Sequence, residues 1–236
     1  PRLVLEHVVI PDSVTKLGAN TFQNCDIEKL ELSNNIVEIP EYCFENANIK
    51  QMDLSNLDGK IKSIHKYGFA YLNNDIGDNN DIILPKFNNV ENIGASAFYK
   101  SYLGNSKIDF SNNTYLDDLV TLTGDTYFIR DSSIGELTFE NCKNLKRLGI
   151  LGYSYFGKVD LEGTKIVGMG NVDAAESYSH DNCITGLMVS YTYIKDFILP
   201  KSIRLMLWES FRGSQIENIQ NEEYVKYAFR TFGSNN

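Results

Sequence analysis

An internal repeat of 22 residues is the feature that most restricts how this chain can fold. The segment from Leu5 to Asp26 and the segment from Ile27 to Asn48 align without gaps, and five apolar positions coincide. The pairs are Val8 with Leu30, Ile10 with Leu32, Val14 with Ile36, Leu17 with Ile39 and Phe22 with Phe44. Apolar positions at a fixed period indicate stacked copies of one unit, because each unit buries its apolar face only against its neighbours. The 236 residues are therefore expected to form one elongated domain.

Each unit begins with a short apolar pattern that predicts a β-strand. Its last three residues alternate with a period of two, as in a strand that buries one face. The pattern occurs as IEKLEL from Ile27, IKQMDL from Ile49, IGELTF from Ile134, ITGLMV from Ile184 and IKDFIL from Ile194. Turns rich in Pro, Asn, Ser and Asp follow and end each extended run. The strands are expected to lie parallel, about 4.8 Å apart, so that nine of them make a ribbon roughly 40 Å long.

One aromatic residue in each unit is expected to be its largest buried side chain. Counting these residues gives eight repeats, at Phe22, Phe44, Phe69, Phe98, Phe128, Phe156, Tyr193 and Phe211. A partial ninth repeat starts at Ile216, residues 216–236 are expected to form a C-terminal cap, and residues 171–182 are a loop insertion. The predicted architecture for residues 1–236 is an α/β-type repeat solenoid. A parallel β-sheet forms one face, and irregular or short helical segments form the other.

The first repeat, IPDSVTKLGANTFQNCDIEKLEL, closely resembles the BspA-like leucine-rich repeat, whose consensus is I-P-x-S-V-x-x-I-G-x-x-A-F-x-x-C-x-x-L. The fourth repeat (ILPKFNNVENIGASAFYKS) and the eighth (ILPKSIRLMLWESFRGS) also match, whereas the seventh departs most. The resemblance implies a secreted or surface-displayed protein that binds other proteins or host matrix. It carries no catalytic residue and no cofactor. The expected localisation is extracellular or at the cell surface, with any signal or anchor outside this sequence.

The composition argues against several classes of partner. A formal net charge of −9, with Lys and Arg alternating with Asp and Glu, disfavours nucleic acid and anionic membranes. The sequence has no run of about 18 apolar residues, so no membrane-spanning segment is predicted. Four cysteines, Cys25, Cys43, Cys142 and Cys183, are too few for a disulfide scaffold and include no C-x-x-C pair.

No residue pattern predicts catalysis or a metal site. The three histidines, His7, His65 and His180, lie in different repeats and lack the spacing of a metal-binding motif. The insertion does gather polar groups, namely Asp173, Glu176, His180, Asp181 and Cys183. Such groups could bind calcium or zinc, but their spacing fits no known ligand arrangement, and a solvated loop is the alternative. We predict an enzymatically inactive protein without metal.

The polar residues of the predicted strands form the candidate binding surface. Asp53, Asp109 and Asp160 are middle residues of strands whose neighbours must point inward, so all three carboxylates are expected on the exposed face, in a column that also includes Met188. The candidate binding residues are Lys29, Glu31, Gln51, Asp53, Lys107, Asp109, Lys158 and Asp160. These charges either keep an exposed sheet soluble or bind a protein partner through charge pairs. We expect a protein-binding module, and the alternative is a structural spacer or assembly subunit of a larger surface or phage particle.

Overall fold

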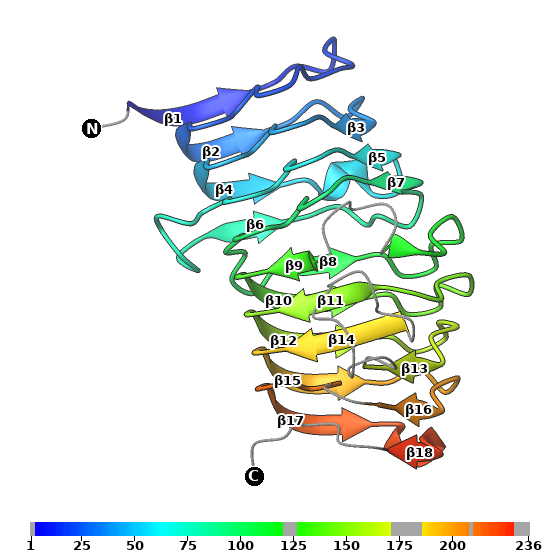
Figure 1. The fold of residues 1–236 in the computed structure, drawn as a ribbon. Coiled ribbons are helices and arrows are strands. Elements are labelled where there is room, and N and C mark those ends of the chain that lie inside the picture. The colour runs from blue at the N-terminus through cyan, green and yellow to red at the C-terminus, as the bar shows by residue number, and fades with distance from the viewer. Residues whose placement is uncertain (1–2, 120–126, 171–185, 208–209, 229–236) are drawn as a thin grey trace.

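The computed structural model describes residues 3–119, 127–170, 186–207 and 210–228, and shows repeats stacked in sequence order from the N-terminus to the C-terminus (Figure 1). The strands that open the repeats, here called the front strands, form two parallel sheets. The first contains β1 (Val4–Val9), β2 (Asp26–Glu31), β4 (Asn48–Asp53) and β6 (Asp81–Ile83). The second contains β8 (Lys107–Asp109), β10 (Ser133–Thr138), β12 (Tyr155–Asp160), β15 (Tyr193–Ile198) and β17 (Gln215–Gln220).

The other side of the stack also consists of parallel strands. Three short ones, β3 (Glu38–Ile39), β5 (Ser63–Ile64) and β7 (Asn92–Ile93), form one sheet. A second sheet contains β9 (Tyr127–Arg130), β11 (Gly149–Gly152), β14 (Gly186–Ser190), β13 (Gly168–Met169), β16 (Leu205–Met206) and β18 (Tyr227–Ala228). The described helices are two 3-10 turns, η1 (Ser55–Leu57) and η2 (Glu222–Tyr224). The expected irregular or short helical segments on this side are not confirmed, because short strands pair there in the described repeats.

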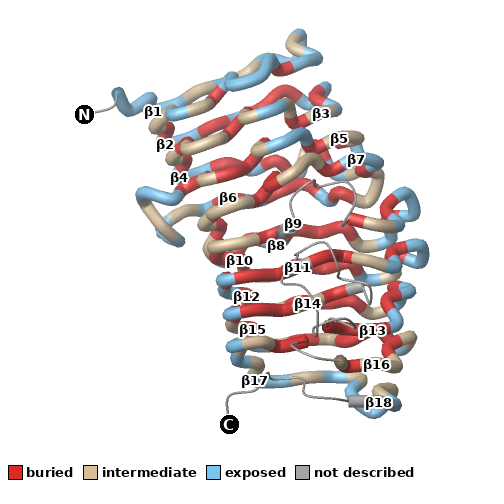
Figure 2. Tube along the Cα trace, viewed as in Figure 1, coloured by how far each residue is buried: buried red, intermediate tan, exposed pale blue. Residues whose placement is uncertain are grey.

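The predicted 22-residue alignment is confirmed by the strand register. Val8 lies opposite Leu30, and Leu30 lies opposite Met52. Leu30 and Met52 are both buried, with 1% and 2% of their surface exposed. The inward positions of successive strands thus form continuous apolar columns, which Figure 2 shows as buried bands along the stack.

Aromatic rings stack through the interior of the first four repeats. The ring centroids of Phe22 and Phe44 are 5.4 Å apart, and those of Phe44 and Phe69 are 5.2 Å apart. Phe98 continues the series at 5.2 Å from Phe69. A second series joins Phe87, Phe110 and Phe139, with centroid distances of 5.4 and 4.9 Å.

In the later repeats, Phe156 and Phe211 are buried as predicted, but two of the predicted aromatic residues lie in another part of the repeat. Phe156 and Tyr193 belong to front strands, where Phe156 lies opposite Ile194 and Tyr193 lies opposite Tyr155. Met188 lies in β14, on the other side of the stack, so it does not belong to the column of front-strand middle residues. Alternation with a period of two identifies a strand but not which sheet it joins. The Phe128 side chain and the insertion at residues 171–182 lie outside the described residues.

The sequence analysis expected the front strands to form one continuous ribbon. The structure instead divides them into two sheets, between β6 and β8. An isolated bridge between Lys86 and Asp109 joins the two sides. Pro85 lies just before this bridge, and a proline has no N–H group to donate to a ladder.

Candidate functional site

The predicted binding residues separate into an exposed set and a partly buried set. In the first front sheet, Lys29 lies opposite Gln51, and the side chains of Lys29 and Glu31 are 49% and 47% exposed. Lys29 Nζ lies 2.6 Å from Glu31 Oε1. His7 Nε2 lies 3.0 Å from the same oxygen. The hydrogen bonds from Lys29 and then His7 lower the pKa of Glu31. Asp53 is also exposed.

In the second front sheet, lysines and carboxylates form one ion-pair network across three strands. Lys107 Nζ lies 3.3 Å from Asp109 Oδ2 and 3.3 Å from Glu136 Oε1. Lys158 Nζ lies 3.5 Å from Glu136 Oε1 and 3.0 Å from Asp160 Oδ2. Glu136 connects the two lysines and was not among the predicted binding residues. Its place opposite both Lys107 and Lys158 follows from the register and could have revealed it.

Asp109 and Asp160 are buried, with 7% and 5% of their surface exposed, so the expectation that they project into solvent is wrong. Each carboxylate accepts a hydrogen bond from the backbone N–H two residues later in the chain. Asp109 Oδ1 accepts a hydrogen bond from the Ser111 N–H at 2.9 Å, and Asp160 Oδ1 accepts one from the Glu162 N–H at 3.0 Å. Asp53 makes the same contact with the Ser55 N–H at 2.9 Å but remains exposed. These aspartates therefore end the strands and shape the turns that follow.

The surroundings of Asp109 determine its protonation. Burial raises its pKa, but hydrogen bonds from Ser111 and the charge of Lys107 outweigh burial, so the pKa of Asp109 is lowered. Burial lowers the pKa of Lys107, but Asp109 and Glu136 outweigh that effect and raise it. The network therefore favours the charged form of both partners at neutral pH.

We expect Asp109→Asn to make the free energy of unfolding less dependent on pH in the acid range. A carboxylate with a lowered pKa in the folded state stabilises the fold above its unfolded pKa, near about 4, and loses this contribution as pH falls through the folded pKa. Urea unfolding followed by circular dichroism between about pH 2 and 6 measures the slope. Asp53→Asn, which alters an exposed aspartate with the same turn contact, is the control. Parallel curves for wild-type protein and Asp109→Asn would contradict the prediction.

The sequence analysis missed a second feature, a column of residues with left-handed backbone conformation in the turns that precede the front strands. This column is here called the edge column. The residues of this column have φ between 49° and 62°. The residues are Asn24, Asn46, Tyr71, Lys100, Asp131, Tyr153, Tyr191 and Gly213. The N–H of Tyr153 donates to the Ser190 carbonyl at 2.9 Å, and the N–H of Tyr191 donates to the Arg212 carbonyl at 2.7 Å. Glycine and asparagine accept this conformation readily, whereas a bulky residue is disfavoured there by about 1–2 kcal/mol.

Two tyrosines of the edge column belong to an exposed aromatic group, here called the tyrosine patch: Tyr153, Tyr155, Tyr191 and Tyr193. The rings of Tyr153 and Tyr191 stack at 5.0 Å, and those of Tyr155 and Tyr193 stack at 5.1 Å. Tyr153, Tyr155 and Tyr191 are 43%, 46% and 45% exposed, respectively. The Arg130 guanidinium lies 5.0 Å from the centre of the Tyr153 ring, and that of Arg212 lies 5.7 Å from the centre of the Tyr191 ring.

A ladder of buried hydroxyl groups holds the turns beneath the patch. The Ser132 N–H donates to Ser154 Oγ at 3.1 Å, and the Ser154 N–H donates to Thr192 Oγ1 at 3.3 Å. The Thr192 N–H donates in turn to Ser214 Oγ at 3.1 Å. Ser154 and Thr192 are 7% and 2% exposed, and each lies between two tyrosines in the sequence. The ladder fixes the backbone that carries the rings.

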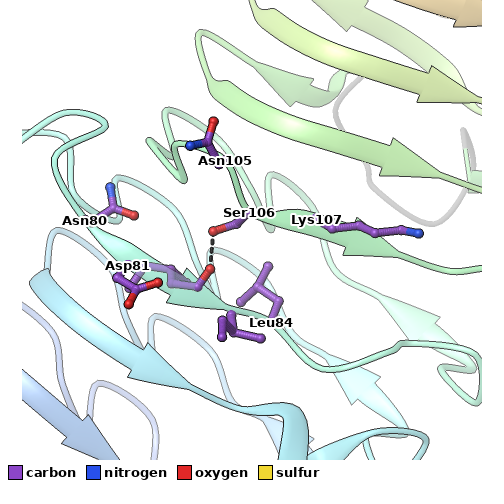
Figure 3. Close-up of a pocket in the computed structure, with 8 residues that line it drawn as sticks. Asn80, Asp81, Leu84, Asn105, Ser106 and Lys107 are labelled. Carbon is purple, nitrogen blue, oxygen red and sulfur yellow. Dashed lines mark hydrogen bonds between the residues drawn. The ribbon is translucent and has the colours of Figure 1, made fainter.

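A cavity of about 280 Å³ lies at the division between β6 and β8 (Figure 3). Its lining includes Asn80 and Asp81 on one side and Asn105 and Lys107 on the other. The Ser106 hydroxyl donates to the Ile82 carbonyl across the division. Asn80 Nδ2 donates to the Gly77 and Tyr102 carbonyls, while Asn80 Oδ1 is buried without a hydrogen-bond partner in the described part of the chain. The lining supplies only scattered polar groups and no catalytic arrangement.

The cysteines are structural where they are described. Burial raises the pKa of both Cys43 and Cys142 to about 12, so these thiols stay protonated and unreactive at neutral pH. Cys25 is half-buried, and Cys183 lies outside the described residues. Among the residues described, no group of three or more His, Cys, Asp or Glu side chains could hold a metal ion. The candidate cluster around His180 is not among those residues.

Comparison with known proteins shows what kind of repeat this is. A family model described as BspA type leucine rich repeat region matches residues 3–120 and 130–230, in six copies. The chain belongs to the BspA-type leucine-rich repeat family. Membership of this family indicates a surface protein-interaction module, and leucine-rich repeats are generally non-enzymatic. No curated protein and no solved structure matches the chain. Within the described ranges, this BspA-type repeat region has no helix that is long and apolar enough to cross a membrane.

Proposed function

We propose that this protein is a non-enzymatic adhesion or recognition module that binds another protein at the cell surface or in the extracellular space. In this proposal, residues 1–236 form one solenoid of about eight repeats and a partial ninth, capped by residues 216–236. The observation that carries the proposal is the long, polar front surface of a BspA-type repeat stack. Its first sheet exposes Lys29, Glu31 and Asp53 next to the exposed apolar side chain of Ile83.

Charged residues on a rigid sheet suit protein recognition, because complementary charge steers the encounter and fixes the register of the complex. In the second sheet, Asp109 and Asp160 are buried and paired with Lys107 and Lys158, whereas the charged residues of the first sheet are exposed. We therefore place the front-surface contact mainly on Lys29, Glu31, Gln51 and Asp53, and assign Lys107 and Lys158 to its margin.

The test is a binding experiment with an extracellular-matrix extract as the probe. Immobilised wild-type protein is exposed to the extract, captured proteins are identified by mass spectrometry, and their affinities are measured by biolayer interferometry. The front-surface variant Lys29→Glu/Asp53→Lys alters exposed residues, so we expect it to fold normally and to weaken binding by more than tenfold. Lys16→Glu, which changes an exposed lysine outside the strands, is the control. If wild-type protein captures no protein, the proposal is wrong.

A structural spacer or assembly subunit is the second candidate, favoured by the exposed apolar residues of β1 and of the position before it. Leu3, Val4, Leu5 and Val9 are 81%, 50%, 38% and 54% exposed. Leu5 lies opposite the buried Ile27, so it occupies a core column that continues to the free edge of β1. Analytical ultracentrifugation of the same sample distinguishes the candidates. Reversible self-association that Leu5→Glu abolishes, without capture of another protein, would favour the structural role.

A further inference from the structure

We infer that the tyrosine patch and its two arginines are the principal contact for a protein partner that presents acidic groups. This inference rests on the proposed function and moves its main contact from the first front sheet to the beginnings of two strands of the second front sheet and the turns before them. The observation behind it is the gathering of Tyr153, Tyr155, Tyr191 and Tyr193 on two adjacent front strands and the turns before them.

The composition of this surface matches that of protein contacts. Tyrosine and arginine are enriched among the residues that contribute most to protein binding, and tyrosine gives a large, amphipathic contact area at low entropic cost. Three of the four rings are more than two-fifths exposed. Since each stacked pair spans two repeats, the rings form a compact patch and are not scattered apolar residues of an ordinary surface.

The backbone beneath the patch supports a binding role more than a folding role. Asn24 and Asn46 occupy the edge column in the first repeats, and Asn46 Nδ2 donates to Asn24 Oδ1 at 2.7 Å. Tyr153 and Tyr191 take the same left-handed conformation, with φ of 52° and 49°, where asparagine would be less strained. The fold alone therefore does not require tyrosine at these two positions.

The ring of Tyr191 is also held in place. A Cβ atom at Gly213 would lie 2.6 Å from Tyr191 Cδ1, so the glycine leaves the space that this ring occupies. The hydroxyl ladder through Ser154 and Thr192 fixes the turns. A rigid aromatic surface loses little freedom on binding, which favours affinity.

The charges of the edge indicate an acidic partner. In a chain with a net charge of −9, Arg130 and Arg212 lie over rings of the tyrosine patch, and Lys100 lies over the ring of Tyr71 in the edge column. Asp131 pairs with Arg130 at 3.3 Å and offsets part of this charge. The Tyr193 hydroxyl donates to Glu217, which adds a second carboxylate beside the patch. Carboxylates of a protein partner would complement the arginines, and its polar groups would meet the hydroxyls of Tyr153, Tyr155 and Tyr191.

The test compares two pairs of stacked, left-handed tyrosines, with the same matrix extract as the probe. Tyr153→Asn/Tyr191→Asn is expected to keep or raise the melting temperature and to weaken binding of the captured protein at least tenfold. Tyr42 and Tyr67 stack at 5.5 Å with φ of 55° and 54°, so Tyr42→Asn/Tyr67→Asn is the matched control and should bind like wild type. Arg130→Gln/Arg212→Gln should weaken binding and reduce its dependence on salt.

The outcomes separate this inference from the proposed function. If the protein is captured and its affinity falls with the front-surface variant but not with Tyr153→Asn/Tyr191→Asn, the inference is wrong and the proposed function stands. The same conclusion holds if neither variant changes the affinity. If digestion of the extract with glycosidases, but not with protease, abolishes capture, the ligand is a glycan and both proposals are overturned. If wild-type protein captures nothing, the inference falls with the proposed function.

Discussion

Replacement of Phe98 by alanine is expected to lower the free energy of unfolding by about 3–5 kcal/mol, because it removes a large ring from a core that cannot close around the gap. Phe98 is fully buried. Its ring stacks on that of Phe69 at 5.2 Å and meets that of Phe87 at 6.4 Å. The loss is therefore shared between two adjacent repeats. Urea unfolding of the purified variant, followed by circular dichroism, measures the change.

Phe22→Ala is the matched control for this prediction. Phe22 stands at the N-terminal end of the same stack, where its ring packs on Phe44 at 5.4 Å. We expect a smaller loss there, because an end position has fewer neighbours and relaxes more easily. A loss below about 1 kcal/mol for Phe98→Ala would contradict the buried position of this ring.

Charge reversal at Asp160 is expected to cost about 3 kcal/mol or more, although the sequence alone suggests an innocuous surface change. Asp160→Lys removes the acceptor of the Glu162 N–H and places a second cation beside Lys158 in a buried position. Asp53→Lys breaks the same turn contact in an exposed position, where we expect a loss of about 1 kcal/mol or less. Urea unfolding of both variants at neutral pH gives the comparison, and equal losses would show that burial of Asp160 contributes nothing.

The first four repeats could be predicted well because their regular spacing assigns each apolar residue to a single position in the repeat. Leu30 and Met52 recur at the same offset, and the Phe22 to Phe98 series repeats at nearly regular intervals. Later repeats vary in length, so the apolar segment around Met188 fits either side of the stack equally well. Its sheet is decided by pairing with β11 and β13, and such pairing cannot be read from the segment itself.

The candidate surfaces were only partly predictable, for two physical reasons. Whether an aspartate such as Asp109 points to solvent depends on the turn after it and on lysines from adjacent strands, not on alternation along its own strand. The tyrosine patch depends on the backbone conformation, because φ at Tyr153 and Tyr191 is positive. A glycine in the sequence suggests a positive φ, but a tyrosine does not. The two tyrosines are also 38 positions apart in the sequence, so no local pattern predicts that their rings stack.

The division between β6 and β8 has a mechanical consequence. On the other side of the stack, β7 and β9 also belong to separate sheets. Among the described residues, the pairing of successive strands is therefore interrupted at the same level on both sides. The connections there include the isolated Lys86–Asp109 bridge, the Ser106–Ile82 hydrogen bond, the hydrogen bond from the Lys100 N–H to the Arg130 carbonyl at 2.9 Å, and the packing of Phe87 on Phe110. We therefore expect a lateral force on the molecule to concentrate at this level, because no extended strand ladder crosses it among the described residues. Pulling on the ends would separate the repeats at this level before it separates the strands within any one sheet.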